Sequence, residues 1–144
     1  MKTLKQVKYL CNKWCKIFNI PKFDVFVVKK LKTGYTACYS RSENCMIFTK
    51  NSLKYNDDAF YPMLFHELGH AKYKMPPYTF SQKVNSEKMA EKFSFKNLKK
   101  YFPEHYKKAI VERKKLIKII KENRKLYKKY KYYYYAFKQI KELQ

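Results

Sequence analysis

Apolar side chains recur every three to four positions over residues 2–18, which is the period of an α-helix with one buried face. The pattern then changes, because residues 23–31 are rich in β-branched and aromatic side chains. Two further segments of this kind cover residues 34–40 and 45–53, separated by polar turn residues. The chain is therefore predicted to begin with a helix followed by a small three-stranded sheet.

A helical pattern returns after the sheet. One helix is predicted over residues 58–74, with Asn56, Asp57 or Asp58 as its N-cap. The sequence Met-Pro-Pro-Tyr ends this helix, because proline cannot continue it. A second helix is predicted over residues 82–100, and these elements together define an α+β fold class.

The last part of the chain contains no glycine and no proline beyond Pro103, so we expect one long helix, broken at most once. An apolar stripe runs along this predicted helix in alternating steps of three and four residues. It consists of Leu116, Ile119, Asn123, Leu126, Tyr130, Tyr133, Phe137 and Ile140. Asn123 is the one polar member and would set the register of a coiled coil or helical hairpin. We favour a segment that folds back over one that self-associates. The predicted division is a domain over 1–102 and a basic, tyrosine-rich helical extension over 103–144.

The composition limits the class of protein. Hydrophobic residues make up 46% of the chain and aromatic residues 19%, which is enough for a packed core and excludes a disordered chain. No apolar run approaches the roughly 20 residues that cross a bilayer. The N-terminus also lacks the uninterrupted apolar stretch of a signal peptide. We therefore expect a cytoplasmic protein without a membrane partner.

The net charge of +23 has two interpretations. Dense lysine could neutralise nucleic-acid phosphates, and the tyrosine tract at residues 129–135 could stack on bases or equally pack on protein. However, only three of the 34 basic residues are arginine, which is the usual reader of guanine and of phosphate geometry. We favour a composition shaped by A/T-rich coding and a solvated surface, and nucleic-acid binding remains the alternative.

The four cysteines are Cys11, Cys15, Cys38 and Cys45, and none of them forms a CxxC pair of the kind that holds structural zinc. We expect reduced, mostly buried thiols. A second metal site and a disulfide pair are the alternatives.

The sequence His-Glu-Leu-Gly-His at residues 66–70 carries the strongest chemical signal. His66 and His70 lie one turn apart on the same face of the predicted helix, so both can bind one ion. Glu67 projects from nearly the same side, where it can take a proton from a water beside the metal. A catalytic zinc site needs three protein ligands and an open fourth position, so the motif requires a third ligand further along.

The next predicted helix supplies that ligand in Glu87. Glu91 follows one turn later, where it can hydrogen-bond His70 or another ligand and orient its ring. The small Ala90 lies between them and allows two helices to approach closely. Gly69 destabilises a helix by roughly 1 kcal/mol relative to alanine, which is understandable if another segment must pass close to it.

The combination HELGH followed by ExxAE resembles the gluzincins, which are zinc metallopeptidases, and is most similar to the minigluzincins and the ImmA/IrrE type. The resemblance covers about residues 45–98 and includes Phe93 after the ExxA core. It implies a minimal zincin-like domain with an N-terminal helix, a three-stranded sheet, an HExxH helix and a glutamate helix. The Zn²⁺ ligands that it implies are His66, His70 and Glu87, with Glu67 as general base and acid.

The resemblance also implies a substrate cleft. The strand over residues 45–52 would be the rim strand that pairs with an extended peptide through its backbone, with Met46, Ile47, Phe48 and Thr49. A tyrosine or histidine would stabilise the oxyanion, and Tyr78, Tyr73 and His105 are available for this role. For Tyr78, packing within a loop is the favoured alternative.

We therefore expect a zinc-dependent endopeptidase that acts on a peptide or protein substrate. The alternative is a nucleic-acid-associated regulatory protein in which zinc is structural or vestigial and the lysine-rich helical extension binds the partner. In a third version the extension delivers the peptidase to a DNA-bound target. In a fourth the extension covers the cleft and inhibits the enzyme.

Overall fold

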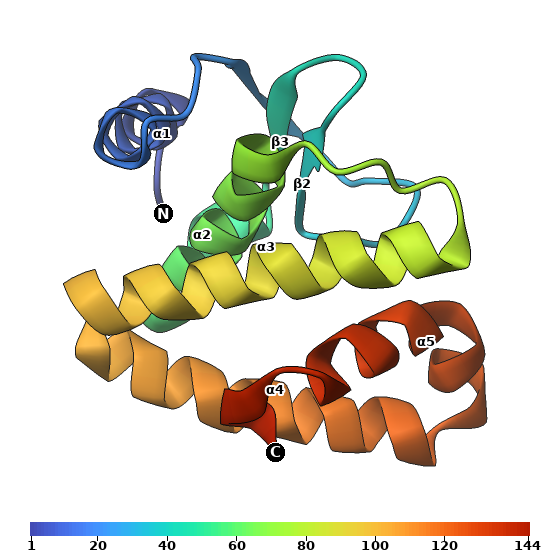
Figure 1. Cartoon of the computed structure of the whole chain (residues 1–144). Helices are drawn as coiled ribbons and strands as arrows, with labels where there is room; N and C mark the ends of the chain where they lie inside the picture. The colour runs from blue at the N-terminus through green and yellow to red at the C-terminus, as the bar shows by residue number, and fades with distance from the viewer.

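The computed structural model describes all 144 residues, and Figure 1 shows how its elements are arranged. The elements in chain order are α1 (Leu4–Phe18), β1 (Asp24–Val28), β2 (Ala37–Ser40), β3 (Cys45–Thr49), a 3-10 turn (Ser52–Lys54), α2 (Asp57–Tyr73), α3 (Phe80–Tyr101), α4 (Pro103–Glu122), α5 (Arg124–Lys138) and a last 3-10 turn (Lys141–Leu143). In Figure 1, α1 and the sheet lie at the top, α3 crosses the middle, and α4 and α5 lie below it. The predicted α+β fold class is confirmed.

The two helices that carry the HExxH and ExxAE motifs begin at residues that satisfy free backbone groups. The side-chain oxygen of Asn56 accepts a hydrogen bond from the Ala59 N–H at 3.2 Å, so Asn56 is the N-cap of α2. Thr79 and Gln82 form a reciprocal capping box at the start of α3. At the other end of α2, Lys74 takes the left-handed conformation and is the C-cap, so the helix ends at Tyr73.

The sheet has the strand order β1-β3-β2, with β1 parallel and β2 antiparallel to β3. Both edges of β3 are occupied, because its residues pair with Asp24–Val28 on one side and Ala37–Ser40 on the other. The prediction that Met46, Ile47, Phe48 and Thr49 form a substrate rim strand is therefore wrong. The strand next to α2 is the edge strand β2.

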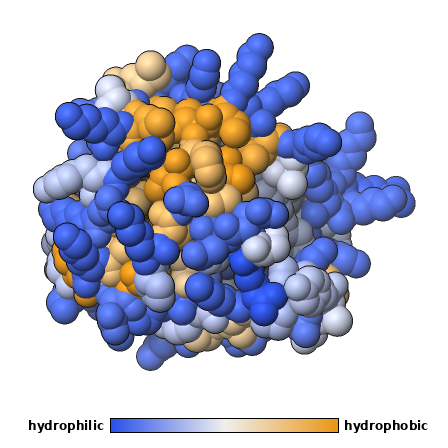
Figure 2. Space-filling model, turned by 90° about the horizontal axis from the view of Figure 1, so that it is seen from above, coloured by the Kyte–Doolittle hydropathy of each residue, from blue (hydrophilic) through white to orange (hydrophobic).

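The hydrophobic core lies between the sheet and the helices. Met46 and Phe48 are fully buried on the face that packs against α1 and α2, and the Trp14 ring of α1 meets the edge of Phe65 on α2. The opposite face is open, since Phe26 is 51% exposed there. Figure 2, a view onto the end of the molecule that carries α1 and the sheet, shows a broad hydrophobic area bordered by hydrophilic side chains.

The C-terminal segment forms a hairpin of α4 and α5 that packs against α3, so it folds back as favoured. The predicted role of Asn123 in the stripe is wrong, because Asn123 leaves the helical conformation and caps α5 by accepting a hydrogen bond from the Leu126 N–H at 3.1 Å. Other members of the stripe do pack on the core, namely Leu116, Tyr133, Phe137 and Ile140. Ala136, Phe137 and Ile140 belong to the same core cluster as Leu98 of α3. The division at residue 102 stays a prediction, and the core is continuous across it.

All four cysteines are free thiols. Burial raises the pKa of Cys11 to about 12 and that of Cys15 to about 11, so both are protonated near neutral pH. None of the helices combines the length and the apolar content that a bilayer crossing requires.

Helices α2 and α3 touch backbone to backbone at Gly69. A Cβ atom placed on Gly69 would lie 2.8 Å from the Cα and 2.9 Å from the carbonyl oxygen of Ala90. These distances are too short for any side chain, so only glycine permits this spacing of the two helices. The close approach expected from Gly69 and Ala90 is confirmed.

We predict that Gly69→Ala destabilises the protein by about 1–3 kcal/mol, because the helices must separate, although alanine favours a helix by about 1 kcal/mol. Urea unfolding in the presence of a chelator measures the change. Ala90→Gly should not rescue Gly69→Ala, since the obstructing atoms belong to the Ala90 backbone. Equal or higher stability of Gly69→Ala would contradict this account.

Candidate metal centre

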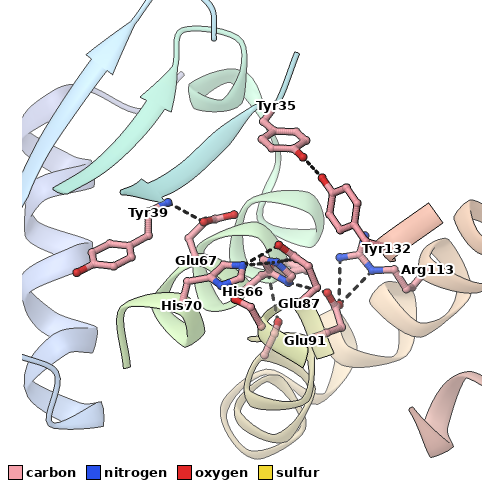
Figure 3. A network of polar contacts seen from close by, with 12 residues as sticks. Tyr35, Tyr39, His66, Glu67, His70, Glu87, Glu91, Arg113 and Tyr132 are labelled. Atoms are coloured by element: carbon pink, nitrogen blue, oxygen red, sulfur yellow. Dashed lines mark hydrogen bonds and ion pairs between the residues drawn. The ribbon is translucent and has the colours of Figure 1, made fainter. Parts of the chain in front are cut away.

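Three side chains from α2 and α3 converge at one point, drawn in Figure 3. The Nε2 atoms of His66 and His70 lie 3.2 Å apart. Glu87 of α3 faces both rings, with Oε2 at 2.9 Å from His66 Nε2 and Oε1 at 3.2 Å from His70 Nε2. The structure therefore brings together the three residues predicted as ligands.

The dimensions of this group fit a metal ion. Ligand atoms placed about 2.0–2.2 Å from a tetrahedral zinc ion lie about 3.4 Å from one another. The two imidazole nitrogens lie 3.2 Å apart, and they lie 2.9 Å and 3.2 Å from the two different oxygens of Glu87. These separations are shorter than that edge length, so the group would open slightly around an ion. Two imidazoles and a carboxylate are side chains that bind divalent metal cations, so the donor set suits a metal ion.

The other ring nitrogens have partners that turn both Nε2 atoms inward. The Nδ1–H of His66 donates to Glu91 Oε2 at 2.7 Å, and Glu91 is 0% exposed. His70 Nδ1 lies 3.2 Å from the hydroxyl of Ser86. The sequence allowed Glu91 to support either histidine, and in the structure it contacts His66. Such partners fix the tautomer and the orientation of a metal-binding ring.

Glu67 occupies a different position from Glu87. Its Oε2 accepts the backbone N–H of Tyr39 in β2 at 2.8 Å, so the edge strand holds this carboxylate. The donor atoms of His66, Glu67 and His70 lie within 4.8 Å of one another, which places Glu67 beside the metal position. Glu87 approaches both rings more closely, so Glu87 suits the ligand and Glu67 the base. Burial raises the pKa of Glu67, which favours proton uptake.

The charges of the metal-free group are interdependent. Burial opposes ionisation of Glu87, but hydrogen bonds with His66 and His70 outweigh it and hold the Glu87 pKa well below its ordinary range. The Glu91 pKa is lowered against burial by the charges of Arg113 and His66. Burial would lower the pKa of His66, yet Glu91 and Glu87 raise it well above its usual value. A proton on His66 therefore takes the place of the cation.

The three residues predicted as oxyanion stabilisers have other partners. Tyr78 is 76% exposed, and its hydroxyl accepts a hydrogen bond from Arg41. Tyr73 packs its ring edge-on against Phe93. His105 pairs with Asp58 at 2.7 Å, at the N-terminal end of α2. None of the three lines the groove described next.

A groove of about 1160 Å³ reaches the candidate metal centre at His66 and Glu67, and residues of α5 form part of its wall. It lies between α2, the segment leading into β2, α4 and α5, and its lining includes His66, Glu67 and Tyr133. The hydroxyl groups of Tyr35 and Tyr132 are in contact across the groove, which ties the β2 approach to α5 (Figure 3). Burial and the charge of Glu87 raise the pKa of Tyr133, so its hydroxyl stays a hydrogen-bond donor.

Sequence reasoning missed these tyrosines and Arg113, which contacts Glu91. The three-to-four stripe includes Tyr133 and leaves out the exposed Tyr135, but it does not indicate which groups Tyr133 faces. Arg113 is one basic residue among many. The position of Arg113 relative to α3 depends on where the hairpin turns, which the stripe pattern does not indicate.

Comparisons of the chain with protein-family models, with curated proteins and with solved structures find no match. What the structure establishes is a group with the HExxH spacing on α2, His66, Glu67 and His70, which forms a candidate metal-binding site.

We predict that zinc binding releases a proton near pH 7. The raised pKa of His66 keeps the metal-free ring protonated, and zinc requires the neutral ring, so affinity should rise about tenfold per pH unit below that pKa. Calorimetry in two buffers of different ionisation enthalpy measures the released proton. His105→Gln, which alters a histidine outside the group, should leave the release unchanged. A binding enthalpy that does not depend on the buffer would contradict the prediction.

Proposed function

We propose that the chain is a zinc-dependent endopeptidase. The observation that carries the proposal is the convergence of His66, His70 and Glu87 on one point, with the carboxylate of Glu67 beside it. Three ligands leave a fourth position open, and a neighbouring carboxylate that is not needed as a ligand is the arrangement of a hydrolytic rather than a structural zinc site. The resemblance of HELGH and ExxAE to the gluzincins supports the same activity.

The residues have separate roles in this proposal. Zinc, when bound, supplies the Lewis acidity that makes water a nucleophile at neutral pH and polarises a scissile carbonyl. Glu67 takes the proton of the attacking water and passes it to the leaving amine, which its raised pKa favours. Tyr39 holds Glu67 through its backbone N–H, and Glu91 keeps the His66 ring in place.

The groove is suited to an extended polypeptide. Its lining is largely apolar and combines the β2 approach, α2 and the α4–α5 hairpin, so side chains of a substrate can be buried on several sides. The edge strand β2 begins at the groove with Ala37 and offers backbone groups for pairing. Tyr133 lines the same groove as Glu67, and we assign to its neutral hydroxyl the role of oxyanion donor.

We predict that Glu67→Gln retains zinc and loses peptidase activity, because the amide cannot accept a proton, whereas His66→Ala loses zinc. Metal analysis of the purified variants and cleavage of casein measure the two effects. Glu122→Gln changes an exposed carboxylate and serves as control. An unchanged cleavage rate for Glu67→Gln would end the peptidase proposal.

We predict that Tyr133→Phe lowers kcat about 100-fold or more and changes KM little, because a donor to the oxyanion acts mainly in the transition state. Tyr134→Phe is the matched control, since Tyr134 belongs to the same tract but does not line the groove. Equal activity of the two variants would remove Tyr133 from the mechanism while leaving the metal centre unaffected.

A further inference from the structure

We propose that Arg113 of α4 is a positioning residue for the metal centre, and that through it the C-terminal hairpin controls metal affinity. This inference rests on the metal site of the proposed function. It assigns a role to the extension that differs from nucleic-acid binding and from covering the cleft.

The first step is the contact between Arg113 and Glu91. The Nε and Nη2 atoms of Arg113 lie 3.1 Å and 3.0 Å from the same carboxylate oxygen, Oε1 of Glu91. The other oxygen, Oε2, accepts the Nδ1–H of His66 at 2.7 Å. Each oxygen of Glu91 therefore has its own partner, and Figure 3 shows the carboxylate between the guanidinium and the ring.

The second step is the burial of Glu91. Its side chain is 1% exposed, so in the folded protein both oxygens depend on protein partners. A buried carboxylate is stable only when it is paired and hydrogen-bonded. The planar guanidinium donates from two nitrogens of fixed geometry, which orients the carboxylate as well as neutralising it. Arg113 thereby determines where Glu91 holds the His66 ring.

The third step is the position of Arg113 itself. Its guanidinium carbon lies 4.8 Å from the centroid of the Phe137 ring, and Phe137 is fully buried on α5. The chain of contacts therefore passes from Phe137 on α5 through Arg113 on α4 and Glu91 on α3 to His66 on α2. Since coupling between two binding events is reciprocal, zinc should stabilise the docked hairpin as much as the docked hairpin favours zinc.

The test is the zinc affinity of Arg113→Met, measured by competition with a chromophoric chelator. Removing partners beyond the ligands typically weakens metal binding 10–100-fold, and we expect about tenfold here. Lys114→Met is the matched control, because it removes a neighbouring charge on α4 that contacts no part of the site. Arg113→Lys keeps the charge but loses the paired donors of the guanidinium, so its zinc affinity should lie between those of the wild type and Arg113→Met.

A double-mutant cycle separates positioning from general destabilisation. If Arg113 acts through Glu91, then Arg113→Met should change zinc affinity less than about twofold in a Glu91→Gln background. The visible spectrum of the Co²⁺-loaded protein should differ between Arg113→Met and Lys114→Met, because the His66 ligand moves. Hydrogen exchange should show that zinc protects α4 in the wild type and in Lys114→Met but not in Arg113→Met.

The inference is overturned if Arg113→Met binds zinc as tightly as Lys114→Met, or if its effect persists unchanged in the Glu91→Gln background. If Arg113→Met does not fold, Arg113→Lys supplies the same comparison, and wild-type affinity in that variant would equally contradict the inference. A wild type that binds no metal would instead refute the proposed function. A wild type that binds zinc but cleaves nothing leaves the role of Arg113 testable by affinity alone.

Discussion

The contact between Gly69 and Ala90 is the constraint on which the candidate site depends. Because no Cβ fits there, α2 and α3 can lie backbone against backbone, and the short side chain of Glu87 then reaches both imidazoles. The ligands are held by two capped helices joined by a short connection, so the group is assembled largely by local structure. A site built on rigid elements keeps its geometry better than one built on loops.

The helices and the main residues of the candidate site could be predicted from the sequence, because the signals that indicate them are local. Periodicity, caps and proline located the helices within a few residues, and the spacing of HELGH and ExxAE indicated which side chains share a face. The identity of Gly69 even indicated a close approach. These inferences depend on residues that are neighbours in sequence or on one turn of a helix.

The errors concern long-range pairing. Nothing in residues 45–52 distinguishes a central strand from an edge strand, since that depends on the parallel pairing of β1 with β3, which follows β2 in the chain. Asn123 fits a register-setting position and an N-cap equally well, and the structure uses it as a cap. Arg113 and Tyr133 acquire their partners only because the hairpin turns at that point. Nucleic-acid binding through the basic surface stays a prediction.

The hydrogen bond from Tyr39 to Glu67 has a consequence for how a bound peptide would meet the proposed base, Glu67. An amide proton donates to one strong acceptor at a time, and the amide proton of Tyr39 already donates to Glu67. A guest strand that extended the sheet as far as Tyr39 would compete for that proton and loosen the carboxylate. A peptide that pairs with β2 as far as Tyr39 would therefore release the Glu67 carboxylate, whereas a peptide that ends before Tyr39 would leave the hydrogen bond to Glu67 intact.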